Sequence, residues 1–252
     1  MTDMKGLCER PRRLLAATLI LFLIVTALYC FASVFSSFGY KKSFRTQAEA
    51  VGTPEEAKIS VVIDPGHGGS DAGASANGLY EKDINLALSE KLAAFLSLSD
   101  INVVMTRTSD VSPATDAVKG SIKAADLRAR VDIAQNTQNC IFVSIHMNKF
   151  PMESCKGMQV FWSPNDERSA ALAQCIQDMA KLDDETNKRM IKKASGSIFV
   201  LDRITSPAVL VECGFLSNAS DATRLSDPVQ QTRIAFVVFC GISRFIDEYY
   251  NG

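Results

Sequence analysis

Short apolar, β-branched runs alternate with helical stretches along most of this chain, and this alternation constrains the fold more than any other feature. Such continuous apolar strands, without a polar residue at every second position, are typical of a sheet covered on both faces. The sequence therefore predicts an α/β fold, an open, mainly parallel, twisted sheet with helices on both faces. The predicted strands cover residues 59–63, 103–105, 141–145, 158–162, 198–201 and 208–211; the predicted helices lie at 83–98, around 127–134, around 172–179 and at the C-terminus; and the polar stretch 106–123 is predicted to be a long surface loop.

The N-terminal region contains an apolar run without a charge at residues 14–35. At 1.5 Å per residue, a helix of this length spans a hydrocarbon core. Arginines at positions 10, 12 and 13 precede the run and favour a cytoplasmic N-terminus. We therefore expect a cytoplasmic segment at 1–13, a transmembrane signal-anchor helix at 14–35, a linker at 36–57 and an extracytoplasmic domain at 58–252. A cleaved signal peptide is the alternative, and the domain is exported in either case.

Composition excludes several other classes of protein. The chain has 27 Lys and Arg against 28 Asp and Glu, so it lacks the basic excess of a nucleic-acid-binding surface. Its seven cysteines are scattered, without a Cys-x-x-Cys pair, which argues against a disulfide scaffold or a thiolate zinc site. The glycines around residues 66–69 are not followed by Lys-Ser or Lys-Thr, so a phosphate-binding P-loop is not predicted.

The only two histidines, His67 and His146, each come at or just after the end of a predicted buried strand. Active sites in parallel sheets lie at the carboxyl ends of the strands. One isolated histidine is usually a core residue, but two at the same edge of a sheet favour a shared function. Glycines on both sides of His67 also allow a tight bend that leaves the ring accessible.

Two imidazoles suit zinc, and a catalytic zinc site normally has a third protein ligand and one open position. A carboxylate is the expected third ligand, and Glu81 at the start of the first predicted helix is the best candidate. Asp71 and Asp83 are alternatives. Glu81 could instead be a first-turn carboxylate that is favoured only by the helix dipole.

Glu212 ends the last predicted strand, where a buried charge is costly unless it has a partner or a function. We expect it to be the general base that accepts a proton from a water molecule at the metal. Its alternative role is structural, as the partner of an arginine such as Arg189. A rival mechanism would use Cys213 as a nucleophile with His146 as its base.

Four segments in this order resemble the zinc-dependent N-acetylmuramoyl-L-alanine amidases of bacterial cell walls. They are IDPGHGG at 63–69 with Asp71 and Gly73, EKD at 81–83, SIHMN at 144–148 and VECGFLSN at 211–218. The resemblance implies that His67, Glu81 and His146 bind Zn²⁺ and that Glu212 is catalytic. It also implies cleavage of the amide bond between the lactyl group of N-acetylmuramic acid and L-alanine of peptidoglycan. Met147 departs from the small residue common after the second histidine, which would alter the pocket wall, and Asn148 is expected to support the substrate or the ligands.

The apolar N-terminal segment, the bare catalytic domain and the stretch 187–201 are similar to the germination-specific amidases of spore-forming Gram-positive bacteria. That subgroup strips stem peptides so that muramic-δ-lactam can form in the spore cortex. The expected partners are thus peptidoglycan and, through the N-terminal helix, the cell membrane. A peptidoglycan-binding protein that does not cleave its ligand stays open as an alternative, as does an enzyme that awaits an activating protein partner.

Overall fold

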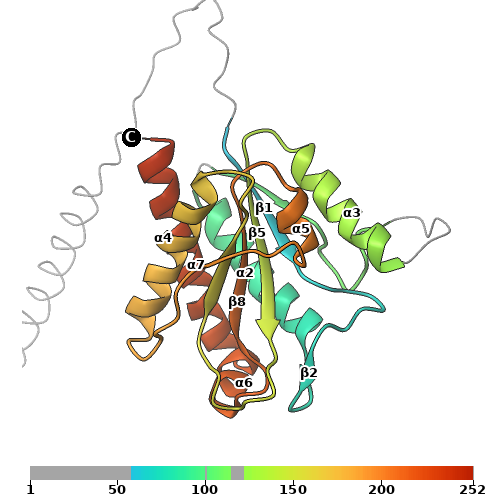
Figure 1. The fold of residues 1–252 in the computed structure, drawn as a ribbon, viewed down its shortest axis with the longest axis vertical. Helices are drawn as coiled ribbons and strands as arrows, with labels where there is room; N and C mark the ends of the chain where they lie inside the picture. The colour runs from blue at the N-terminus through green and yellow to red at the C-terminus, as the bar shows by residue number, and fades with distance from the viewer. Residues whose placement is uncertain (1–57, 100, 115–121, 252) are drawn as a thin grey trace, which may run out of the picture. The chain divides into compact units, whose positions relative to one another are not determined.

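The computed structural model describes residues 58–99, 101–114 and 122–251. Within them, a six-stranded sheet has the order β4-β1-β5-β8-β6-β7 (Figure 1). Four of these strands, β4, β1, β5 and β8, are parallel to one another, whereas β6 pairs antiparallel with β8 and parallel with β7. The predicted mainly parallel α/β sheet is confirmed. The strands are β1 Ser60–Pro65, β4 Asn102–Met105, β5 Cys140–Asn148, β6 Gln159–Trp162, β7 Lys192–Lys193 and β8 Ala208–Phe215.

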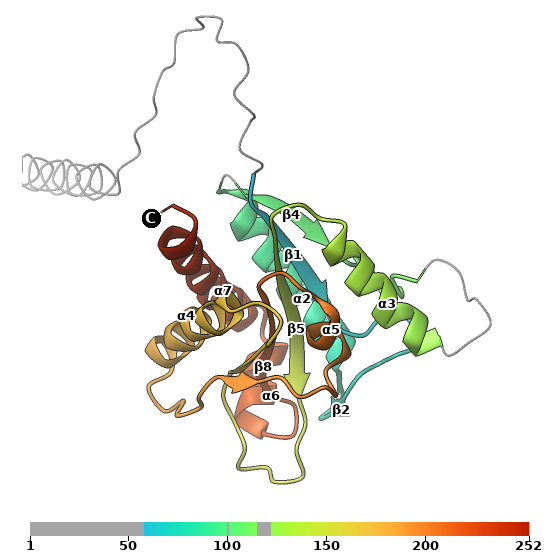
Figure 2. The same cartoon turned by 45° about the horizontal axis from the view of Figure 1, so that its top comes forward.

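Helices cover both faces of this sheet, as Figure 2 shows from a second direction. Alternate residues of a strand point to opposite faces. Accordingly, Val61 and Ile63 pack in one core with Leu88 of a helix, whereas Val62 packs in a second core with Val131 of another helix. The first core involves α2, α4, α6 and α7, and the second, smaller core involves α3 and α5. The helices are α2 Glu81–Ser97, α3 Ile122–Gln135, α4 Arg168–Asp183, α5 Phe199–Arg203, α6 Ala219–Ser226 and α7 Pro228–Tyr249.

One sequence prediction of local structure was wrong, and a second was wrong in part. The run 198–201 is not a strand, because α5 occupies Phe199–Arg203 and buries Val200 and Leu201 against the second core. A short apolar run has no periodicity that separates a strand from a buried helical turn. The predicted surface loop at 106–123 begins with two buried residues, Thr106 and Arg107. Because these side chains are polar, the sequence pattern predicted that they would be exposed.

The predicted C-terminal helix is confirmed as α7, but not all of its large apolar residues face the core. Phe236 is about half exposed, while Ile246 is buried. The residues that α7 buries in the first core are Ile234, Ala235, Val237, Val238, Ile242, Phe245 and Ile246. Phe236 instead packs edge-on against Phe95 of α2 at the surface. A helix with apolar residues on most sides does not reveal its inward face by sequence alone.

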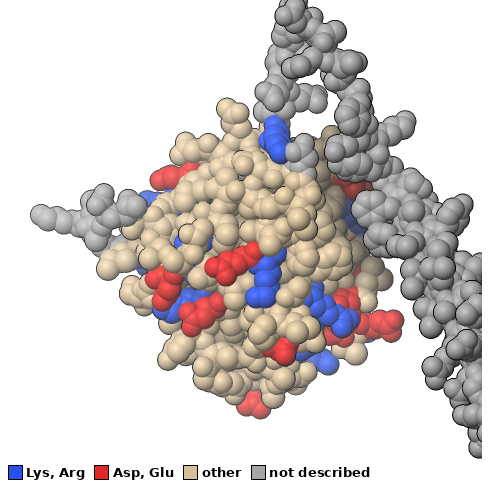
Figure 3. Space-filling model, turned by 180° about the vertical axis from the view of Figure 1, so that it is seen from behind, with Lys and Arg blue, Asp and Glu red and all other residues tan. Residues whose placement is uncertain are grey.

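The predicted membrane anchor at 14–35 and linker at 36–57 lie outside the described residues. Among the residues that are described, no helix has both the length and the apolarity needed to cross a membrane. The transmembrane helix therefore stays a prediction. Figure 3 shows the face behind that of Figure 1, where positively and negatively charged side chains lie beside one another.

Candidate metal centre and active site

The first predicted ligand lies in a sharply bent turn directly after β1. His67 has a φ of 61°, in the left-handed region that non-glycine residues rarely adopt. Gly68 and Gly69 follow with φ values of 132° and 58°. The turn is closed by two backbone hydrogen bonds between Gly68 and Asp71, of 2.9 and 3.1 Å. Strained backbone of this kind is retained mainly where surrounding contacts hold it, often at functional sites.

Glu81 opens α2 and is only 3% exposed. Its Oε2 accepts the backbone N–H of Ala74 at 2.7 Å, and its Oε1 accepts that of Met147 at 3.0 Å. These bonds hold the carboxylate between the glycine-rich turn and the end of β5. Met147 itself is buried in the first core, on the opposite face from its neighbour His146, so the predicted effect on the pocket wall is not supported.

His146 lies near the end of β5, with its ring over Gly66. A Cβ atom at position 66 would lie 2.2 Å from two ring atoms of His146, so only glycine leaves room for this imidazole. At Gly73, likewise, an added Cβ would lie 2.6 Å from Glu81 Oε2 and 2.7 Å from His67 Cδ2. These two glycines form the space in which the ligand side chains meet.

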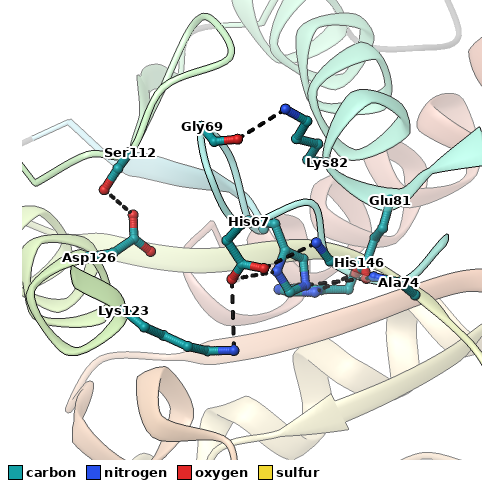
Figure 4. Close-up of polar contacts among 12 residues, drawn as sticks. His67, Gly69, Ala74, Glu81, Lys82, Ser112, Lys123, Asp126 and His146 are labelled. Carbon is teal, nitrogen blue, oxygen red and sulfur yellow. Dashed lines mark hydrogen bonds and ion pairs between the residues drawn. The ribbon is translucent and has the colours of Figure 1, made fainter. Parts of the chain in front are cut away.

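The structure brings the three predicted ligands together (Figure 4). His67 Nε2 lies 3.2 Å from Glu81 Oε2, and His146 Nδ1 lies 2.8 Å from Glu81 Oε1. One ligand atom from each of the three residues lies within 4.8 Å of the others. Tetrahedral zinc, with ligands at about 2.0–2.2 Å, separates its ligand atoms by roughly 3.3–3.6 Å. The group can therefore hold a metal ion, and its two imidazoles and one carboxylate match the donor set of catalytic zinc.

Asp71, an alternative ligand in the sequence analysis, lies behind the first histidine. Its Oδ2 is 3.0 Å from His67 Nδ1, which leaves the Nε2 of His67 facing Glu81. A carboxylate on the far nitrogen of a histidine fixes the orientation of the ring and is a common partner of metal-binding histidines. Asp83, the other alternative, is exposed on α2.

The ionisable side chains of this site shift one another's pKa values. Burial alone would lower the pKa of His67, but the hydrogen bonds and charges of Glu81 and Asp71 outweigh it and raise the pKa. Burial alone would raise the pKa of Glu81, but hydrogen bonds from His146 and His67 lower it well below its usual range. Without a metal, the carboxylate thus stays ionised and attracts positive charge.

Glu212 lies beside His146, because the two residues are register partners of the parallel pair β5–β8. Its Oε2 is buried and has no hydrogen-bond partner among the described residues. Burial, reinforced by the charge of Glu81 against the opposing influence of the two histidines, raises the pKa of Glu212 to about 7. A carboxyl group with a pKa near neutrality suits general acid–base chemistry.

The two alternative roles around this residue are not supported. The guanidinium of Arg189 donates to Lys156 O at 2.7 Å and to Gln159 Oε1 at 3.1 Å, and it stacks on Phe215. Cys213 is buried in the first core, on the other face of β8, and burial strongly raises the pKa of its thiol. A nucleophilic cysteine needs a lowered pKa, so this thiol is a core residue.

Sequence reasoning missed the buried polar residues beneath the site. Asp64 accepts hydrogen bonds from Arg130 Nη1 at 2.5 Å, Thr106 Oγ1 at 2.7 Å and Ser144 Oγ at 2.7 Å. Arg130 also donates to the backbone oxygen of His67 at 2.7 Å. The one available signal was Asp64 itself, a charged residue at the end of an apolar run, which requires a buried partner.

Comparison with known proteins agrees with this geometry. Residues 61–244 match the N-acetylmuramoyl-L-alanine amidase family. The germination-specific N-acetylmuramoyl-L-alanine amidase of Bacillus subtilis is 36% identical over 197 residues, which cover 77% of this chain and 82% of that protein. The structure of the CwlD amidase from Clostridioides difficile, solved in complex with the GerS lipoprotein, aligns with a TM-score of 0.71 at 34% identity and covers 76% of this chain and all of that one.

A second solved structure extends the likeness. The catalytic domain of CwlV, an N-acetylmuramoyl-L-alanine amidase from Paenibacillus polymyxa, aligns with a TM-score of 0.64 at 31% identity, over 75% of this chain and 98% of that one. The shared sheet, the convergent ligand group and the matched span of residues lead to the same conclusion. This chain is an enzyme of the N-acetylmuramoyl-L-alanine amidase family.

Proposed function

We propose that this chain hydrolyses the bond between N-acetylmuramic acid and L-alanine of peptidoglycan with a zinc ion held by His67, Glu81 and His146. The observation that carries the proposal is the convergence of these three side chains beside a carboxylate with an unpaired buried oxygen. The family match supplies the reaction, and the donor set supports zinc over magnesium or calcium, which prefer ligand sets made of oxygen atoms.

When bound, zinc supplies a Lewis acid that activates water and polarises the amide carbonyl. Glu212 accepts a proton from the attacking water, and it later donates that proton to the nitrogen of the departing L-alanine. In the metal-free protein the pKa of Glu212 is raised to about 7, and a carboxyl group in this range can both accept and donate a proton at neutral pH. Asp71 holds the ring of His67, and the backbone amides of Ala74 and Met147 hold Glu81 in place throughout.

The biological setting that we propose is the maturation of spore cortex peptidoglycan, outside the cell membrane. The likeness to the germination-specific amidase of Bacillus subtilis supports this role. The predicted signal-anchor at 14–35 supports an extracytoplasmic catalytic domain tethered to the membrane. Because the similar CwlD amidase was solved in complex with the GerS lipoprotein, we also propose that a protein partner takes part in controlling this enzyme.

The test is digestion of purified cortex peptidoglycan, with mass spectrometry of the products. The zinc-loaded protein should release stem peptides that begin with L-alanine, leaving muramic acid residues without peptide. A chelator should abolish the release, and zinc should restore it. Products cleaved at any other bond, or release that persists undiminished after zinc is removed, would contradict the proposal.

A further inference from the structure

The arginine that follows β4, Arg107, is 4% exposed and lies between the two segments that carry the first two ligands. Its Nε donates to Pro65 O at 2.9 Å. Its Nη2 donates to Gly66 O at 3.0 Å and also to Lys82 O at 2.8 Å. A single nitrogen therefore joins the residue before His67 to the residue after Glu81.

The surroundings of Arg107 show that this bridge is built into the fold. Its Nη1 donates to Ser109 O at 3.0 Å, so all four of these hydrogen bonds go to backbone oxygens. A Cβ atom at Gly68 would lie 2.9 Å from two side-chain atoms of Arg107 and 2.5 Å from Val111 O. The glycine turn and the segment after β4 are thus packed directly against each other, with the guanidinium between them.

A second set of contacts repeats the bridge at the surface. Lys82 Nζ donates to Gly69 O at 3.0 Å and pairs with Asp110 Oδ2 at 2.6 Å, while Asp110 Oδ1 accepts the N–H of Gly69 at 2.8 Å. Figure 4 shows the bond between Lys82 and Gly69. The turn that carries His67 and the first turn of α2 are therefore joined from the buried side by Arg107 and from the solvent side by Lys82.

We infer that Arg107 is a positioning residue that sets the spacing between His67 and Glu81, so that the metal site is preformed before an ion enters. The inference rests on the proposed metal-binding function. Its physical basis is the fixed geometry of the guanidinium, whose N–H groups point in set directions and can serve several carbonyls at once. A lysine at this position keeps the charge but has one nitrogen on a flexible stem. It cannot reach the same carbonyls together.

The test compares Arg107→Lys with Arg168→Lys, which changes an arginine that pairs with Asp166 and has no contact with the ligand segments. Zinc affinity is measured by competition with a chromophoric chelator, at a temperature where circular dichroism shows each protein to be folded. Arg107→Lys should bind zinc about 10- to 100-fold more weakly, the usual effect of residues that support metal ligands. Arg168→Lys should match the wild type.

The visible absorption of the cobalt-loaded proteins provides a second readout that a merely structural residue would not change. We expect the cobalt bands of Arg107→Lys to differ from those of the wild type, because the ligand geometry is relaxed. Folded Arg107→Lys with wild-type zinc affinity and an unchanged cobalt spectrum overturns the inference. If the wild type itself binds no zinc, the proposed function fails instead, so the two failures are distinct.

A measurement on the wild type covers the case in which the variant does not fold. In the metal-free protein, the Nε proton of Arg107, assigned by NMR through its proximity to Gly68, should exchange slowly with solvent. Slow exchange supports a bridge that exists before metal binding. Rapid exchange contradicts it, whatever the stability of the variants.

Discussion

Asp64 and Glu212 are carboxylates on the two strands that flank β5, and their surroundings differ: Asp64 is fully buried, whereas Glu212 is partly buried. Asp64 accepts hydrogen bonds from an arginine and two hydroxyl groups. Burial would raise its pKa, but the charge of Arg130 and these hydrogen bonds lower it. Glu212 has an unpaired buried oxygen, and burial raises its pKa to about 7.

Within one sheet, this difference distinguishes a carboxylate that stabilises the fold from one that is available for catalysis. A buried charge whose hydrogen bonds are complete stabilises the fold and has no free capacity for a substrate. A buried carboxylate without a partner is costly for stability, and it is retained where its proton affinity is needed. By this criterion Asp64 supports the turn before His67, whereas Glu212 is available to react.

Several substitutions test this contrast between Asp64 and Glu212, and the largest expected effect is on the rate of turnover. Glu212→Gln keeps the size of the side chain but removes its ability to accept a proton. We expect the rate of stem-peptide release to fall by about 10²- to 10⁴-fold, the usual contribution of a general base. Zinc content, measured by elemental analysis, should stay at one ion per chain. The exposed control Glu167→Gln should retain full activity; a comparable loss there, or near-normal turnover in Glu212→Gln, would remove the basis of the contrast.

The next effect concerns the free energy of unfolding. Asp64→Asn leaves the 2%-exposed Arg130 with Asp126 as its only carboxylate partner among the described residues, which should lower the free energy of unfolding at pH 7 by about 1–3 kcal/mol. The pKa of Asp64 is depressed in the folded state, so its contribution is present above the unfolded value of 3.8 and is lost as the pH falls through the folded pKa. Urea unfolding at several pH values should therefore show wild type and variant converging in acid. A difference that is small at pH 7, or that persists at low pH, would mean that Asp64 is not held as an ion pair.

Glu212→Gln should have the opposite effect on stability in the metal-free protein. The pKa of Glu212 rises from 4.5 in the unfolded chain to about 7 in the folded protein, so the wild type loses stability as the pH rises through that window. The variant should be more stable by up to about 3 kcal/mol above pH 7, and by nothing near pH 4.5. Thermal or urea unfolding across this range measures the gain. A variant less stable than the wild type at pH 8 would show that the carboxylate has a partner.

The smallest expected effect is at Cys213, next to Glu212 but on the other face of the strand. Cys213→Ala should cost about 1 kcal/mol of stability through lost packing. Its turnover should stay within about twofold of the wild type, and thiol alkylation of the folded wild type should not inhibit the enzyme. Strong inhibition by alkylation at this thiol would support the alternative mechanism in which Cys213 is the nucleophile.

The strand ends could be predicted from sequence because the signals are local. His67 and His146 follow continuous apolar runs, and parallel strands bring their carboxyl ends to one edge. Glu81 could be chosen as the third ligand only through the donor chemistry of zinc and the family resemblance, whereas Asp71 lies against the Nδ1 of His67, away from Glu81. The overall α/β architecture could be predicted because short apolar strands alternate with helical stretches along the chain.

Other features depend on partners far away in the chain. Asp64 and Arg130 are 66 residues apart, and no local sequence pattern indicates that their side chains form an ion pair. Arg107 occurs in a polar stretch that reads as a surface loop, but it is buried because the carbonyls of the His67 turn satisfy it. The antiparallel direction of β6 and the two-residue strand β7 are likewise set by pairing and not by composition.

The central claim is that three residues from distant segments share one divalent ion. Anomalous diffraction from zinc-loaded crystals, recorded on both sides of the zinc absorption edge, tests it most directly. The account predicts one strong peak within about 2.0–2.2 Å of a nitrogen of His67, a nitrogen of His146 and an oxygen of Glu81. A peak elsewhere, or a zinc ion that leaves any of these three side chains uncoordinated, would contradict the account.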